Sequence, residues 1–329
     1  MPCTLLLSAG IIRVESANPL RRVKFVALTQ GKAAHRWGIF LSLVANSVWG
    51  AAALYWMETK PVAPIDVLAH RATWTLPAAL LVLVVAGRLS STLGFLKDWK
   101  VLRVMGLAAF LISINWGVFL YAVTTGRATE ASLGYFLLPI LTVLAGVMIF
   151  RERPSLPQRI AIGMATLGIV VQVAAEGGIP IVSLALAISF ALYSVIRKQV
   201  SVDAMQGLFL ESLFLMPAGL AWLMLHQWAG LGQFGLKTDF FLLFAGAFTA
   251  IPLLTHITAS RLLPLSTVGL LSYIGPTLQL LVAQTLLGES LSMMTLLSFI
   301  FVWCGLGFII QDNIRSYRKI RKAGMHPPP

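Results

Sequence analysis

The sequence predicts an all-α integral membrane protein with ten transmembrane helices, arranged as two inverted repeats of five helices. Three observations lead to this fold: the composition, the spacing of apolar runs, and an internal similarity between the two halves. Of the 329 residues, 58% are hydrophobic and only 11% are charged, against about 25% charged in soluble proteins. This excludes an ordinary soluble enzyme, because even large soluble domains carry abundant charge on their surfaces.

The apolar runs give the ten predicted helices. Each run is about twenty residues long, which is the length that crosses a ~30 Å hydrocarbon core as a helix. The breaks between the runs contain proline, glycine or charged residues. The predicted spans are 37–57, 67–87, 101–124, 131–150, 158–175, 180–197, 207–225, 239–260, 266–287 and 292–311.

The basic residues predict the orientation of these spans. Of the 25 lysines and arginines, 21 fall in the two tails and in alternate loops, whereas the opposite side holds only Lys60, Arg127 and Lys237. Cytoplasmic loops carry the excess of basic residues in membrane proteins. We therefore expect a multi-pass protein of the bacterial inner membrane with both termini in the cytoplasm. The net charge of +13 then reflects topology and attraction to anionic lipid, and no nucleic-acid partner is predicted.

The two halves of the chain resemble each other. Pro139 and Glu152 are separated by thirteen positions, and so are Pro276 and Glu289. Because five spans are an odd number, the second copy enters the membrane from the opposite side. The predicted organisation is a cytoplasmic tail over 1–36, which we expect to be disordered, a first repeat over 37–175, a second repeat over 178–311 and a basic cytoplasmic tail over 312–329.

Inverted repeats are typical of secondary transporters, since the two halves can exchange conformations around a central site. We therefore predict a secondary-active permease for a small metabolite or drug, with proton coupling left open. A passive channel and an unrecognised intramembrane enzyme are the alternatives. The sequence has no HExxH, GxSxG or Walker motif, and we predict no cofactor, no metal site and no catalytic residue.

Two charged residues within spans are the most informative. An ionisable group inside a membrane span costs at least ~2.5–3.5 kcal/mol and usually faces a cavity or a partner. Arg71 and Glu211 align between the halves, each with an aromatic residue three positions later, Trp74 in the first half. We expect Arg71 to lie toward the outer surface and Glu211 toward the inner surface, attracting each other as a gate, with Glu211 as the candidate for proton coupling. For Arg71 the alternative is snorkelling to the headgroups.

Matched helix breaks predict the rest of the pathway. Gly and Pro residues interrupt the fourth and ninth spans at corresponding places, which is typical of a binding site near the bilayer midplane. The alternative is that they only allow close helix packing. If they form one cavity, Tyr135 and Tyr273 line its opposite walls. The predicted pathway residues are Arg71, Trp74, Asn115, Tyr135, Pro139, Glu211, Tyr273 and Pro276.

Several short motifs occur together: Trp49-Gly50, His70-Arg71 with Trp74, Asn115-Trp116, EASLGYF (130–136), SFALYSVIRK (189–198), Glu211 with Pro217, and YIGPT (273–277) followed by Gly288-Glu289. With these motifs, residues 36–312 resemble the RarD branch of the EamA transporters, within the drug/metabolite transporter superfamily. The resemblance implies a ten-helix inner-membrane permease with two EamA repeats and a small-molecule substrate. The expected partners of the chain are this substrate and the lipid bilayer, and the sequence leaves open whether the protein forms a homodimer.

Overall fold

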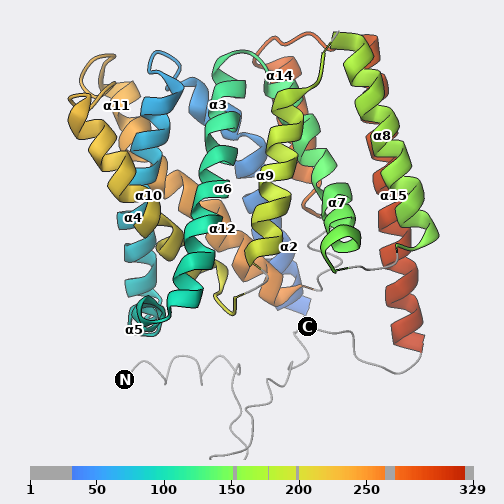
Figure 1. Cartoon of the computed structure of the whole chain (residues 1–329), viewed down its shortest axis with the longest axis horizontal. Coiled ribbons are helices and arrows are strands. Elements are labelled where there is room, and N and C mark those ends of the chain that lie inside the picture. The colour runs from blue at the N-terminus through green and yellow to red at the C-terminus, as the bar shows by residue number, and fades with distance from the viewer. Residues whose placement is uncertain (1–31, 151–153, 177, 198–199, 264–270, 323–329) are drawn as a thin grey trace, which may run out of the picture.

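The computed structural model describes residues 32–150, 154–176, 178–197, 200–263 and 271–322, and every structural statement below concerns these residues. Within them, all regular elements are helices (Figure 1). The expected N-terminal tail over 1–36 lies outside the described residues except for its last five positions, which begin the first helix.

The first half of the chain forms α2 (Lys32–Gly50), α3 (Ala52–Met57), α4 (Pro64–Val85), α5 (Leu89–Leu93), the short 3-10 helix η1 (Gly94–Lys97), α6 (Trp99–Thr124), α7 (Ala128–Phe150) and α8 (Leu156–Glu176). The second half forms α9 (Ile181–Arg197), α10 (Ala204–Leu225), α11 (Leu236–Leu243), α12 (Ala245–Leu262), α14 (Ile274–Thr285) and α15 (Met293–Lys322). The helices coincide with the apolar runs of the sequence. In lipid no water is available to the backbone N–H and C=O groups, so an apolar segment pairs them within a helix.

Six helices of the described residues are long and apolar enough to cross a membrane, and up to seven spans result if the bent pair α11 and α12 counts as one. Helices α11 and α12 meet at 46°. The shorter α9 is also apolar, with 17 residues. Side chains such as Leu81 and Val85 are exposed on the outside of the bundle, as expected where the solvent is lipid.

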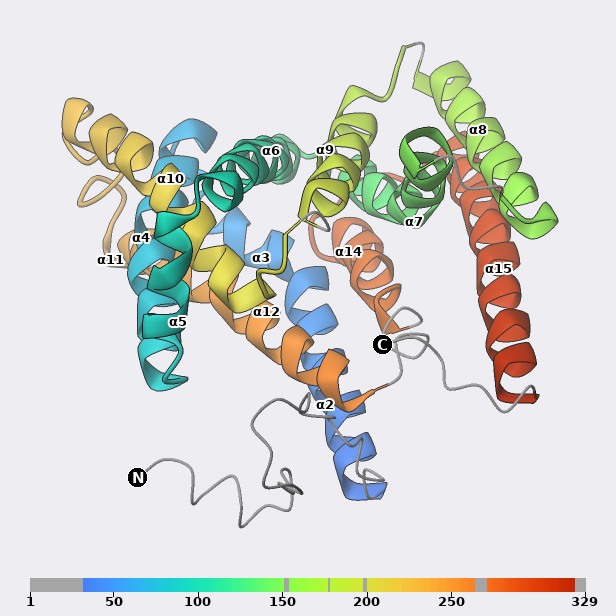
Figure 2. The same ribbon diagram turned by 60° about the horizontal axis from the view of Figure 1, so that its bottom comes forward.

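The helices stand side by side, with short connections at two opposite faces of the bundle (Figures 1 and 2). We name the faces after one residue in each. The Glu289 face holds the turn between α6 and α7, the connection from α14 to α15, and α11, at the top of Figure 1. The Asp203 face holds α5 and the connection into α10, at the bottom. Helix α4 therefore starts at the Glu289 face, and α10 starts at the Asp203 face.

Specific helix pairs build the interior. Helix α2 packs against α12 and α14, and α9 packs against α6 and α7. Two further close pairs are α4 with α10 and α8 with α15. Glycine allows some of these contacts: a Cβ on Gly134 of α7 would lie 2.7 Å from the carbonyl oxygen of Ser183 in α9. The glycine of the fourth span thus serves close helix packing, which was the alternative to a cavity.

Two details differ from the simple apolar runs. The first span breaks between α2 and α3, next to Gly50, whose Cβ would lie 2.8 Å from the carbonyl oxygen of Gly275. The last helix, α15, continues to Lys322, so the basic segment expected as a tail extends the final helix beyond the apolar run.

Glu289 ties the loop after α14 to the start of α7. Its carboxylate accepts hydrogen bonds from the backbone N–H groups of Ala128 and Thr129, at 2.6 and 2.7 Å, and from the Thr129 hydroxyl at 2.6 Å. An anionic cap satisfies N–H groups that the first helical turn leaves unpaired. Glu289 follows the predicted span 266–287, a position where capping and loop electrostatics are the expected roles, and in the structure its carboxylate caps α7.

We expect Glu289→Ala to lower the free energy of unfolding by about 2 kcal/mol, because it removes a charged helix cap and the hydroxyl bond. The measurement is thermal unfolding of the purified protein in detergent. Glu58→Ala is the control, since Glu58 forms an exposed pair with Lys237, and exposed pairs contribute about 1 kcal/mol or less. Equal destabilisation by both substitutions would contradict the capping role.

Candidate functional site

Arg71 lies in a box of aromatic and polar side chains from four helices. Its guanidinium carbon is 4.0 Å from the centre of the Trp116 ring of α6 and 4.9 Å from that of Trp56 in α3. Its Nε donates a hydrogen bond of 3.1 Å to the hydroxyl of Thr249 in α12. The side chain is buried, with 9% exposure. We call Arg71, Trp56, Trp116 and Thr249 the Arg71 box.

A hydrogen-bond network holds one wall of this box. The Tyr135 hydroxyl of α7 donates to Asn115 Oδ1 at 3.2 Å. Asn115 Nδ2 in turn donates to the carbonyl oxygen of Leu186, at 3.0 Å, and to the Ser189 hydroxyl, at 3.1 Å, both in α9. Since Asn115 directly precedes Trp116, these bonds fix the part of α6 that contacts the guanidinium. Two predicted pathway residues, Asn115 and Tyr135, thus support the surroundings of a third, Arg71.

Arg71 has no carboxylate partner in the described part of the chain. Arginine stays protonated in proteins, so the box holds a full positive charge. Every carboxylate whose side chain the structure describes makes its contacts elsewhere: these are Glu58, Asp66, Asp98, Glu130, Asp203, Glu211, Asp239, Glu289 and Asp312.

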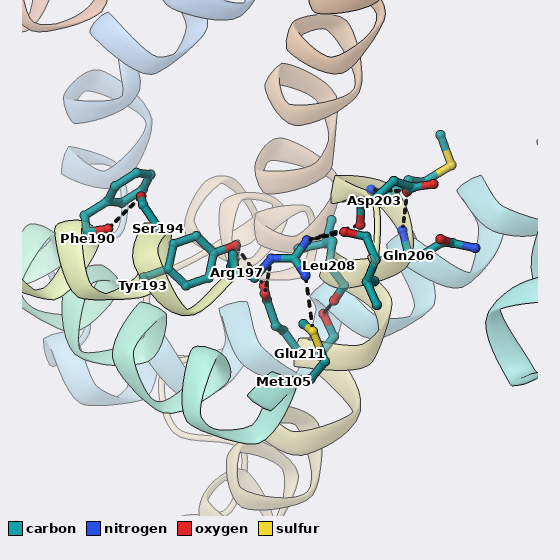
Figure 3. Close-up of polar contacts among 12 residues, drawn as sticks. Met105, Phe190, Tyr193, Ser194, Arg197, Asp203, Gln206, Leu208 and Glu211 are labelled. Carbon is teal, nitrogen blue, oxygen red and sulfur yellow. Dashed lines mark hydrogen bonds and ion pairs between the residues drawn. The ribbon is translucent and has the colours of Figure 1, made fainter. Parts of the chain in front are cut away.

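Glu211 lies in a second polar site, near the Asp203 face (Figure 3). Its Oε1 is 3.3 Å from Arg197 Nε, and its Oε2 accepts a bond of 3.3 Å from the Tyr193 hydroxyl. Arg197 also donates from Nη2 to the carbonyl oxygen of Asp203 at 3.1 Å. Only 3% of Glu211 is exposed. We call Glu211, Arg197 and Tyr193 the Glu211 lock, because they join α9 to α10.

The expected pairing of Arg71 with Glu211 is wrong for this conformation. Each residue lies seven positions into its helix, hence about 10 Å along the axis from the helix start. Since α4 and α10 start at opposite faces, the two charges lie at opposite depths. The charge partner of Glu211 is Arg197, the last residue of the predicted span 180–197, for which no pairing with Glu211 was predicted.

Gly207 makes room for the lock. It lies one helical turn before Glu211, and a Cβ at this position would overlap the guanidinium of Arg197. A second ion pair, Arg88 with Asp203, lies at the same face, and the Asp203 side chain also accepts from the N–H groups of Met205 and Gln206 at the start of α10. Two ion pairs and a helix cap thus lie around the start of α10 at this face of the bundle.

Two other predicted pathway residues, Trp74 and Tyr273, contact side chains outside the Arg71 box and the Glu211 lock. The Trp74 indole N–H points to His70 Nδ1, at 3.3 Å, rather than to Arg71. Tyr273 packs with the apolar cluster around Phe136, whereas Tyr135 packs with the separate cluster around Phe119. The two tyrosines thus pack against different parts of the interior, and the expectation that they line opposite walls of one cavity stays a prediction.

The two prolines of the predicted pathway differ in how far they can be described. The carbonyl oxygen of Pro276 accepts a bond of 2.8 Å from the Ser132 hydroxyl, which joins α14 to α7. Pro139 belongs to α7, but its side chain lies outside the described residues. Trp56 and Thr249, which sequence reasoning missed, carry no local signal of a site: a tryptophan near a span end and a threonine within a span are common in membrane helices.

The described residues contain no group of three or more His, Cys, Asp or Glu side chains that could hold a metal ion. What the arrangement offers instead is one buried cation facing aromatic rings and one buried carboxylate paired near the opposite face. Such groups can bind charged molecules or a proton, and they can hold a gate.

The chain is similar in sequence to a family of membrane transporters. Residues 36–174 match the EamA-like transporter family. Protein RarD of Salmonella typhi is 35% identical over 287 residues, which cover 86% of this chain and 98% of that protein. The chloramphenicol-sensitive protein RarD of Pseudomonas aeruginosa is 33% identical over 298 residues, covering 88% and 98%. A crystal structure with 19% sequence identity has a TM-score of 0.55, covers 82% of this chain and 96% of its own, and shows a shared fold alone.

Proposed function

Since this chain belongs to the EamA-like transporter family and has RarD proteins as relatives, we propose that it is a secondary-active permease that moves a small metabolite or drug by alternating access. Family membership makes it a multi-pass membrane transporter and not an enzyme. The proposal adds the mechanism, which is alternating access, and the topology. The topology is ten crossings of the bacterial inner membrane, in two inverted five-helix repeats, with both termini in the cytoplasm.

The helix packing supports two related halves. If each helix of the first repeat is exchanged with its counterpart in the second, the packing of α2 on α12 becomes the packing of α9 on α6. In the same way, α2 on α14 becomes α9 on α7, and the pairs α4–α10 and α8–α15 are unchanged. A pseudo-twofold relation of this kind is the arrangement of inverted-repeat transporters.

The observation that carries the proposal is the placement of the two charges. Arg71 and Glu211 occupy matched positions, and each has partners from the end of the preceding span of its own repeat: Trp56 for Arg71, and Tyr193 with Arg197 for Glu211. The two sites lie toward opposite faces. The first repeat thus carries a buried cation toward the Glu289 face, and the second repeat carries a buried ion pair toward the Asp203 face.

In this proposal the Glu211 lock is a gate at the cytoplasmic face. Two unit charges 4 Å apart attract each other by about 4 kcal/mol at an effective dielectric of 20, which can hold α9 against α10 yet be released by a proton. Protonation of Glu211 removes its charge and leaves Arg197 free to turn toward the headgroups. We therefore propose Glu211 as the group that couples transport to protons.

A passive channel is the remaining alternative, and flux measurements separate the two. Metabolites whose levels differ between cells lacking and overproducing the protein identify candidate substrates, which are then tested by counterflow in liposomes. The permease proposal predicts saturable uptake that is accelerated by substrate on the opposite side. Single-channel currents without such exchange would support a channel instead.

The proposed topology predicts the outcome of reporter fusions. Reporters fused after Lys60, Gly178 and Gly232 should be active in the periplasm, and those after Ser155 and Val202 should be active in the cytoplasm, because the basic residues cluster on the side of the latter two. The measurement uses a paired alkaline phosphatase and fluorescent-protein reporter at each site. The reverse pattern would contradict the orientation, and a pattern that does not alternate would contradict ten crossings.

A further inference from the structure

The buried charge of Arg71 is not neutralised within the described part of the protein. Its Nε has a neutral partner, the Thr249 hydroxyl, and two indole rings lie within 5 Å of the guanidinium carbon, at 4.0 and 4.9 Å. Neither Nη nitrogen has a hydrogen-bond acceptor among the residues that the structure describes, and no ion pair there includes Arg71. The N–H groups on the two Nη nitrogens of Arg71 are therefore available to donate hydrogen bonds to a bound molecule.

A buried charge without a partner is costly in free energy for the folded protein when no ligand is bound. A charged group removed from water must be compensated by a partner charge or by hydrogen bonds. Indole rings attract a cation through their faces, but they accept no hydrogen bonds from the two Nη groups. By contrast, Arg197 has Glu211 and two backbone carbonyls around it. The chain can thus neutralise a buried arginine with a carboxylate, and it does not do so at Arg71.

We propose that the Arg71 box binds a carboxylate group of the transported molecule. This inference rests on the proposed permease function and names the class of substrate: small organic monoanions. The planar, forked guanidinium matches a carboxylate with two parallel hydrogen bonds. The described residues place a single cation in the box, which balances one negative charge and leaves the second charge of a phosphate monoester unmatched. Trp56 and Trp116 provide apolar surface beside the bound group.

The test uses matched acids and amides, which have similar shape but differ in charge. The purified full-length protein in detergent is titrated with acetate and acetamide, benzoate and benzamide, and indole-3-acetate and indole-3-acetamide, all at constant ionic strength. Thermal unfolding and tryptophan fluorescence report binding. We expect at least one acid to raise the unfolding temperature and its amide to bind at least tenfold more weakly.

Three variants locate the effect. Arg71→Gln should abolish the preference for the acid, and Arg71→Lys should retain the preference with weaker binding, because lysine keeps the charge but lacks the fork. Arg159→Gln is the control, since Arg159 is exposed and its Nε donates to the carbonyl oxygen of Pro154, away from the Arg71 box. It should bind as the parent does. Arg71→Lys also guards against misfolding of the glutamine variant, which is checked by size-exclusion chromatography.

Several results would overturn the assignment: equal binding of acid and amide in every pair, no stabilisation by any acid, an unchanged preference in Arg71→Gln, or equal stabilisation by sodium chloride alone. The last result would identify an inorganic anion as the counter-ion. Counterflow of the bound acid in liposomes separates this inference from the function. An acid that binds but is never exchanged contradicts the permease and leaves the anion site standing, whereas saturable exchange of a neutral compound that Arg71→Gln does not affect contradicts the anion site alone.

Discussion

Gly207→Ala should break the Arg197–Glu211 pair without changing any charge in the protein. The added Cβ would overlap the Arg197 guanidinium, which must then move away from the carboxylate 3.3 Å from its Nε. Breaking a buried ion pair leaves an uncompensated charge and costs about 3–5 kcal/mol when one partner is lost. We expect a loss of about 3 kcal/mol in the free energy of unfolding, measured by thermal unfolding in detergent.

The chain offers a matched control for this substitution. Gly163 lies in α8, and a Cβ there would meet no atom within 4 Å. Alanine has a higher helix propensity than glycine by about 1 kcal/mol, so Gly163→Ala should leave the stability unchanged or raise it slightly. Arg197→Gln should resemble Gly207→Ala, because both leave Glu211 without its cation. If Gly207→Ala behaved like Gly163→Ala, Arg197 would not be held against Glu211 in the folded protein.

The membrane helices could be predicted from the sequence because hydropathy and helix length follow directly from the thickness of the bilayer. The predicted runs 67–87, 101–124 and 207–225 correspond to α4, α6 and α10 within a few residues. The break between α2 and α3 and the bend between α11 and α12 could not be predicted. The break between α2 and α3 lies where Gly50 closely approaches Gly275 of a distant segment, and hydropathy does not report such contacts.

The candidate site was predicted only in part, for a similar reason. Arg71 and Glu211 stand out in the sequence because an ionisable group is costly in a membrane span. Their partners do not stand out: Thr249 lies 178 positions from Arg71 in the chain. The sequence predicts that the two charges lie toward opposite surfaces and also that they attract each other as a gate, which requires a short distance between them. In an inverted repeat, matched positions lie at opposite depths, and each charge contacts its own neighbours there, Trp116 for Arg71 and Arg197 for Glu211.

Glu211→Gln is expected to abolish accumulation driven by a proton gradient while exchange of substrate continues. The amide has nearly the same shape as the protonated acid and cannot take up or release a proton in its place. It can still accept a hydrogen bond from the Tyr193 hydroxyl, which bonds the carboxylate at 3.3 Å. Arg197, 13% of whose side chain is exposed, can turn toward the headgroups. The variant should therefore fold, with the lock held in its released form.

Two measurements in liposomes test this expectation with a substrate identified by counterflow. Under an imposed pH gradient, the parent should accumulate substrate against its gradient, and Glu211→Gln should reach only equal concentrations on both sides. Without a gradient, counterflow should remain measurable in both. Glu58→Gln is the control, because it also removes a paired carboxylate, at 38% side-chain exposure near the opposite face, and it should accumulate as the parent does. Uphill transport by Glu211→Gln at the parental level would assign the Glu211 lock a purely structural role. The proton would then have to enter through another group, or transport would follow the substrate gradient alone.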